Sequence, residues 1–167
     1  KTRSSPIVKA IEDSGVVVYA VATDPSPTIR KERIVDEQTE MRVLEIYEMD
    51  DAPIEVGVER KLISHVDQGA VGSDVVIVTD YGHGLLSDDF VDHICNLQNF
   101  LAVNVQSNAG NRGFNSLSRY SRADFCTMNG GEARLEVRRR HVEFDHFIPS
   151  IVDRLTARGV LVTQGGA

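Results

Sequence analysis

The stretch DVVIVTDYGHG, residues 74–84, decides the fold class of this chain. Between Asp74 and Thr79 the apolar residues form a continuous run, which is typical of a strand buried in a parallel sheet. Gly82 and Gly84 follow it and predict a tight turn, and Ser87 predicts the N-cap of a helix that runs to Leu97. The stretch therefore predicts a strand, turn and helix unit.

The same alternation recurs on both sides of this stretch. A helix is predicted before it, because four apolar residues recur at intervals of four: Ile54, Val58, Leu62 and Val66. After it we predict strands over 100–105, 124–128 and 160–163, a helix that opens at Gly130 and a helix over 144–157. This order predicts an α/β fold with a mostly parallel sheet and helices on both faces.

The first third of the chain predicts a different arrangement. A short helix from Ile7 leads into residues 16–22, VVVYAVA, which we predict to be another buried strand. Two β-rich stretches, 28–35 and 41–49, predict a charged antiparallel hairpin within about 27–50. We expect this hairpin to be either a solvated edge or a flap over an anionic ligand, and it is the expected interface of a homodimer.

Composition limits the class of protein. The chain has 167 residues and 41% hydrophobic content, so we expect one domain over 1–167. Its 18 basic and 25 acidic residues give a net charge of −7, which argues against a nucleic-acid partner.

No apolar run reaches the length of a membrane span and the N-terminal residues lack a signal core, so we expect a cytoplasmic protein. Cys95 and Cys126 lack metal-ligand spacing and predict reduced core thiols.

Several stock motifs are absent or incomplete. No GxxxxGK[ST] pattern occurs, which excludes a P-loop kinase, and no GxSxG or HExxH pattern supports a serine hydrolase or a zinc protease. Residues 82–87 approach the dinucleotide fingerprint GxGxxG, but Ser87 replaces its third glycine and the next strand ends in Asn104-Val-Gln106 without an acidic residue. A dinucleotide-dependent oxidoreductase is thus a minor alternative.

Polar residues follow all four predicted parallel strands. Because ligands of open α/β sheets bind beyond the carboxyl ends of the strands, these residues predict a ligand crevice: Thr79 and Asp80, Asn104 and Gln106, Thr127 and Asn129, and Thr163 and Gln164. Glycines at 82, 84, 130, 131, 165 and 166 permit turns whose backbone N–H groups converge on an anion such as phosphate. The alternative is that they only form tight turns between strands and helices.

Four segments resemble the ribokinase-like (PfkB) carbohydrate kinases, and within them the branch that phosphorylates heptose 7-phosphate in bacterial ADP-heptose synthesis. Residues 27–35 are similar to its Thr-rich Lys-x-Arg strand, and residues 79–84 to its Asp-Tyr-x-x-Gly turn. Asn129-Gly130-Gly131-Glu132 matches an Asn-x-x-Glu motif, and Thr163-Gln164-Gly165-Gly166 is similar to a Thr-x-Gly turn.

The resemblance implies an ATP- and Mg²⁺-dependent kinase acting on a sugar or sugar phosphate. Under it, Asn129 and Glu132 organise Mg²⁺, Thr163 and Gly165 contact the nucleotide, and three residues contact substrate or phosphate: Asp80, Gly82 and Asn104. The family's general base is expected beyond Ala167 and its first strand before Lys1, so we expect an incomplete kinase domain that is inactive alone. Asn104-Val-Gln106 departs from the Asp-x-Lys of many relatives. The alternative function is a non-catalytic nucleotide- or sugar-binding module of the same fold.

Overall fold

The computed structural model describes residues 6–22, 28–107 and 110–164, and the chain divides into two compact units. The first unit is Lys1–Ala52 and the second is Pro53–Ala167. That both units belong to one kinase domain stays a prediction.

The first unit contains a short helix and the predicted hairpin. Helix α1 spans Pro6–Glu12, and strands β1 (Arg30–Val35) and β2 (Arg42–Glu48) pair antiparallel, with Ile34 opposite Leu44. The turn between them is polar, and the hydrogen bond from the Thr39 hydroxyl lowers the pKa of the Asp36 carboxyl. The prediction of a charged antiparallel hairpin is confirmed.

The strand predicted over residues 16–22 is wrong. These residues form no helix or strand, and Val17 and Tyr19 are 75% and 48% exposed. A β-strand needs a neighbour to accept and donate its backbone hydrogen bonds, and no described strand pairs with this segment. The apolar run alone therefore did not indicate a sheet position.

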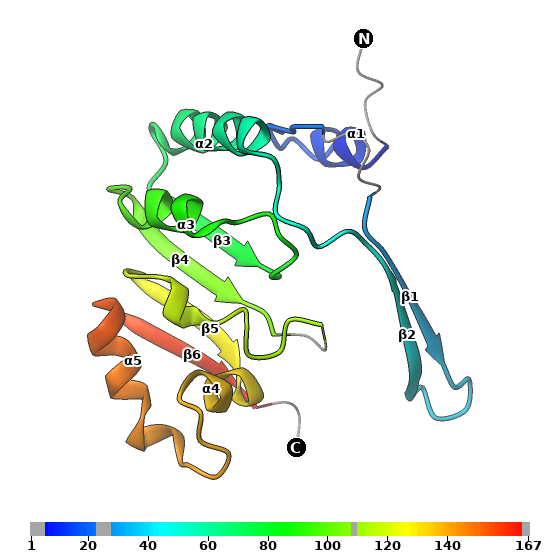
Figure 1. Cartoon of the computed structure of the whole chain (residues 1–167), viewed down its shortest axis with the longest axis vertical. Helices are drawn as coiled ribbons and strands as arrows, with labels where there is room; N and C mark the ends of the chain where they lie inside the picture. The colour runs from blue at the N-terminus through cyan, green and yellow to red at the C-terminus, as the bar shows by residue number, and fades with distance from the viewer. Residues whose placement is uncertain (1–5, 23–27, 108–109, 165–167) are drawn as a thin grey trace. The chain divides into compact units, whose positions relative to one another are not determined.

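The second unit is built on a four-stranded parallel sheet (Figure 1). Its strands lie in the order in which they follow one another along the chain: β3 (Val75–Asp80), β4 (Phe100–Val105), β5 (Phe125–Asn129) and β6 (Gly159–Thr163). Every neighbouring pair is parallel, so all four carboxyl ends meet at one edge of the sheet. The predicted α/β fold is confirmed.

The helices of this unit begin and end close to the predicted positions. They are α2 (Val56–Ala70), α3 (Asp88–Cys95), α4 (Gly130–Glu136) and α5 (Ile148–Leu155), with short 3₁₀ turns η1 (Leu117–Arg119) and η2 (Phe144–His146). Ser87 caps α3 as predicted, since its side chain accepts a hydrogen bond from the Phe90 N–H. The helix expected over 144–157 is instead η2 followed by α5, because Pro149 in the first turn of α5 lacks the N–H that a continuous helix would use.

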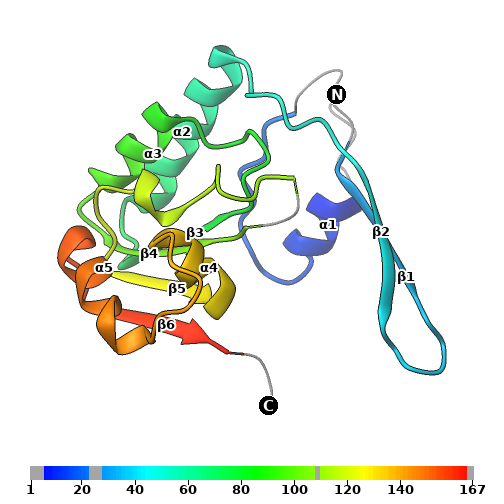
Figure 2. The same ribbon diagram turned by 60° about the horizontal axis from the view of Figure 1, so that its bottom comes forward.

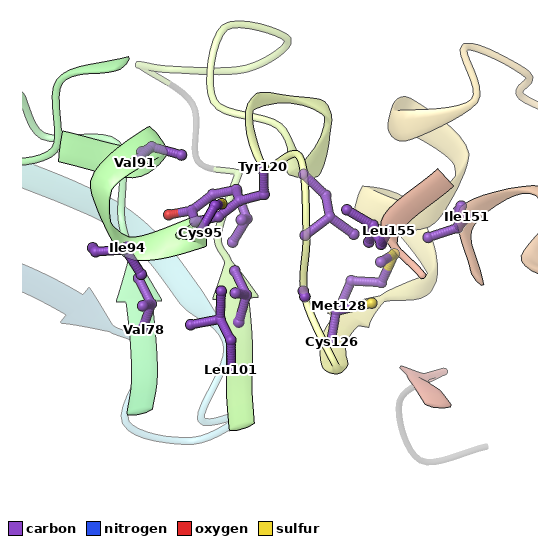
Figure 3. Packing of buried hydrophobic residues seen from close by; sticks show 14 of the residues in the cluster. Val78, Val91, Ile94, Cys95, Leu101, Tyr120, Cys126, Met128, Ile151 and Leu155 are labelled. Atoms are coloured by element: carbon purple, nitrogen blue, oxygen red, sulfur yellow. The ribbon is translucent and has the colours of Figure 1, made fainter. Parts of the chain in front are cut away.

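The core lies on one face of the sheet. Alternate residues of the strands, among them Val78, Leu101 and Cys126, pack against residues of α3 and α5 (Figure 3). On the opposite face Ile77 and Leu161 are 72% and 50% exposed. The described helices of the second unit therefore cover one face, so the expectation of helices on both faces is met on one side only. A continuous apolar run places apolar side chains on both faces of a strand and so predicts that both faces are buried. It does not indicate which segments cover each face.

Among the described residues, no helix combines the length and the apolar character that crossing a membrane requires.

Candidate functional site

The carboxyl edge of the sheet brings Asn129 and Thr163 together. They are paired in register on the neighbouring strands β5 and β6, and α4 begins directly after Asn129, beside the ends of both strands (Figure 2). A pocket of about 400 Å³ opens here, which we call the strand-end pocket, and it is lined by Asn129, Gly130, Gly131, Arg134, Phe144, Thr163 and Gln164. Two of the predicted site residues thus line one pocket.

Asn129 and Glu132 form a capping box at the start of α4. The Asn129 Oδ1 accepts a hydrogen bond from the Glu132 N–H at 2.9 Å, and the Glu132 Oε2 accepts one from the Asn129 N–H at 2.8 Å. The other carboxylate oxygen, Oε1, accepts from the Ser107 N–H at 3.0 Å. The motif therefore fixes the start of the helix and ties it to the loop after β4.

The donor set of this pair fits a hard metal ion that prefers oxygen ligands. No group of three or more His, Cys, Asp or Glu side chains in the described parts of the chain could enclose a metal. Asn129 and Glu132 offer one amide oxygen and one carboxylate, each with a lone pair left beyond the capping bonds. Mg²⁺ suits such a set, because it retains several waters and takes one or two carboxylates together with phosphate oxygens.

Arg134 and Phe144 form one wall of the strand-end pocket. The Arg134 guanidinium lies 4.7 Å from the centre of the Phe144 ring and donates to the Gly130 carbonyl at 3.3 Å. A Cβ at Gly130 would lie 3.1 Å from the ring, so glycine lets Phe144 approach the turn. Neither side chain was predicted from the sequence, although a basic residue one turn beyond a glycine-rich helix start was a usable signal.

Asn104 lies away from this pocket. Its Nδ2 donates to the Thr127 carbonyl at 3.1 Å and to the Thr127 hydroxyl at 2.8 Å. Both residues are on the face of the sheet that the helices leave uncovered. The structure therefore places Asn104 as a cross-strand contact, and its predicted contact with substrate stays a prediction.

Asp80 is also separated from the pocket, because its side chain points to the covered face. It is 3% exposed, and its carboxylate accepts four hydrogen bonds, from the Gly82 N–H at 2.9 Å, Tyr120 Oη at 3.0 Å, Asn115 Nδ2 at 3.3 Å and Arg119 Nη1 at 3.3 Å. Burial first, and the Asp80 charge second, raise the pKa of Tyr120 far above its usual value, so this hydroxyl remains a donor. We call these residues and Asn111 the Asp80 cluster.

Gly82 is part of the same arrangement. Its φ is +65°, and a Cβ at this position would lie 2.7 Å from the Cβ of Asn115. Asn111 adds a hydrogen bond to the Tyr81 carbonyl at 2.8 Å. Glycine at 82 is thus required by the packing of the loop over 110–120, and its role as a phosphate contact stays a prediction. The contacts of this loop with the end of β3 were not predicted from the sequence.

Gly165, the second predicted nucleotide contact, lies outside the described residues. Thr163 is the last residue of β6 and lines the strand-end pocket.

No protein-family model matches the chain. It is similar to curated proteins named bifunctional protein HldE: 25% identical over 126 residues in Helicobacter hepaticus, 26% over 157 in Hyphomonas neptunium and 29% over 123 in Marinomonas sp.. These alignments cover 75%, 92% and 74% of this chain, but 25%, 31% and 24% of the relatives. The chain thus spans about a quarter to a third of the length of the curated relatives that it matches.

Proposed function

We propose that this chain is part of an ATP- and Mg²⁺-dependent kinase that phosphorylates a sugar or sugar phosphate of the heptose 7-phosphate type. Similarity to proteins named HldE and the resemblance to PfkB kinases both support this class. The observation that carries the proposal is the strand-end pocket, where Asn129 and Thr163, from two separate motifs of that family, lie in register beside the start of α4.

Residues of the strand-end pocket and residues outside it have separate parts in the proposed reaction. Asn129 and Glu132 hold a hydrated Mg²⁺, which when bound neutralises charge on the nucleotide phosphates. Thr163 and Gly165 contact those phosphates, and the Arg134 guanidinium lies at the same pocket as a fixed positive charge. Phosphoryl transfer requires mainly such positioning and charge stabilisation. Asp80 and Gly82 shape the turn after β3, and Asn104 is a proposed contact to substrate.

The metal assignment is tested on the full-length protein with Glu132→Gln. This change removes the carboxylate charge and keeps one side-chain oxygen, which can accept from the Asn129 N–H but not from the Ser107 N–H as well. It should lower kcat/KM for ATP by about 10- to 100-fold. Glu143→Gln is the matched control, because this exposed glutamate makes no side-chain cap bond. Steady-state ADP release at limiting Mg²⁺ measures both variants.

Two results would change the assignment. Unchanged turnover in Glu132→Gln would contradict a metal role for this motif. Binding of an ATP analogue without any turnover on sugar phosphates would favour the non-catalytic binding module.

The hairpin supports a second element of the proposal, a homodimer. Ile34, Leu44 and Ile46 are exposed and occupy neighbouring register positions on one face of the hairpin. Burying these side chains against a second copy would remove apolar surface from water. Leu44→Glu should shift the protein to monomer in sedimentation velocity, whereas Val43→Glu, at the exposed residue that the strand register skips, should not. Equal sedimentation of both variants and the unchanged protein as monomers would contradict the dimer.

A further inference from the structure

A cavity of about 740 Å³, separate in most of its lining from the strand-end pocket, lies between α4 and the loop after β4. Its volume is within the range of small-molecule sites. Apolar side chains and hydroxyls share the lining: Leu117, Met128 and Leu135, with Ser107, Ser116 and Ser118. The cavity can therefore hold both a carbon skeleton and polar substituents.

Five arginines line this cavity: Arg112, Arg134, Arg138, Arg139 and Arg140. Its two acidic residues are already engaged. Glu136 pairs with Arg154 at 2.6 Å, and Glu132 accepts backbone hydrogen bonds from Ser107 and Asn129. The cavity is thus strongly cationic, in a chain whose net charge is −7.

Most of these arginines have no partner within the described ranges. Arg112, Arg138, Arg139 and Arg140 are exposed and make no ion pair or side-chain hydrogen bond to another described residue. Elsewhere in the unit Arg119, Arg122 and Arg154 pair with carboxylates. Adjacent like charges repel one another, so a group of unpaired arginines is stabilised when an anion binds between them.

The backbone after α4 directs the chain across this cavity. Arg138 has a φ of +54°, a left-handed conformation that glycine usually adopts after a helix, and its N–H bonds to the Leu135 carbonyl. A side chain other than glycine costs stability in this conformation. Arg138 thus occupies a position where the backbone favours a residue without a Cβ.

We propose that this arginine-lined cavity binds a phosphorylated small molecule that carries at least two negative charges. Guanidinium groups bind phosphate oxygens through two parallel hydrogen bonds, and their charge assists each bond. A single phosphate would leave several of the guanidinium groups without a partner. The apolar lining contributed by Leu117, Met128 and Leu135 fits an organic skeleton between the phosphates.

This inference goes beyond the proposed kinase function, because most of the cavity lining is separate from the strand-end pocket, although Glu132, the proposed Mg²⁺ ligand, also lines the cavity. The two share only Gly131 and Arg134 among their lining residues. Arg134 connects them, so occupation of the cavity by an anion can influence the strand-end pocket.

The test is isothermal titration of the full-length protein with two probes, inorganic pyrophosphate and a hexose bisphosphate. Arg139→Gln/Arg140→Gln should weaken binding of the recognised probe at least about tenfold, and rising salt should weaken it in the unchanged protein. Arg60→Gln/Lys61→Gln is the charge-matched control, since these exposed residues of α2 do not line the cavity. Tighter binding of the hexose bisphosphate identifies an organic ligand, and tighter binding of pyrophosphate an inorganic one.

A third variant separates this inference from the proposed function. Thr163→Val alters the strand-end pocket alone and should leave binding of both probes unchanged. If Thr163→Val abolishes binding while the arginine variant retains it, the probes occupy the nucleotide pocket and the cavity assignment is overturned. Absence of binding of either probe to the unchanged protein overturns it as well, whether or not the protein has kinase activity.

Discussion

Two polar clusters lie near the carboxyl ends of the strands of the same sheet. They differ in whether their charged side chains form hydrogen bonds and ion pairs within the protein. The Asp80 cluster is closed: its carboxylate is buried and accepts hydrogen bonds from Gly82, Asn115, Arg119 and Tyr120. Around the larger cavity, the Arg138, Arg139 and Arg140 side chains are exposed and make no ion pair with another described residue. A saturated cluster stabilises the fold, whereas an unsaturated one is available to a ligand.

The largest effect is expected from Asp80→Ala. It would remove the buried acceptor of the Tyr120 hydroxyl and one ion pair of Arg119, which keeps its bonds to Asn115, Leu86 and Asp88. The expected cost is about 3–5 kcal/mol in free energy of unfolding. Urea denaturation measures the loss. Asp153→Asn, an exposed change on α5, should stay within about 0.5 kcal/mol. A similar small loss for Asp80→Ala would show that the cluster is not structural.

The free energy of unfolding should also decrease at alkaline pH, because a buried thiol must then lose its proton. Burial raises the pKa of the Cys126 thiol from 9.0 to about 11. Because the folded state holds this proton more tightly, its contribution is complete below pH 9 and is lost as the pH rises through 11, by about 3 kcal/mol. Unfolding in urea at pH 8–11 measures the slope, which Cys126→Ala should flatten. An equal slope in both proteins would contradict the assignment to Cys126.

A smaller effect is expected at Asn129, where capping and function can be separated. Asn129→Ala removes the acceptor for the Glu132 N–H and should cost about 1 kcal/mol of stability. Asn129→Ser retains an N-cap acceptor and should be as stable as the unchanged protein, yet lose kinase activity if the amide contacts the metal. Full activity in Asn129→Ser would limit the motif to capping.

The smallest effect is expected from Arg139→Gln/Arg140→Gln. Since these side chains pair with no described residue, the free energy of unfolding should change by less than about 0.5 kcal/mol. Thermal and urea denaturation check this. A loss comparable to that of Asp80→Ala would make the arginines structural and remove the contrast between the two clusters.

Sequence patterns predicted most elements of the second unit because those patterns are local. The Ser87 cap, the four-residue spacing of α2 and the polar ends of the strands each depend on residues a few positions apart. The convergence of Asn129 and Thr163 also followed from parallel strands. The prediction of a strand over 16–22 was wrong because a strand depends on a non-local condition: another strand must pair with it.

The sequence by itself determined the α/β class, the order of strands and helices in the second unit, and the edge at which polar residues gather. Only the tertiary structure decided which way each of those residues points. Thr79 and Asp80 are adjacent, yet one is exposed and the other is buried against Arg119, 39 positions later in the chain. Successive side chains of a strand lie on opposite faces, and which face is covered depends on contacts between distant segments, which no local pattern encodes.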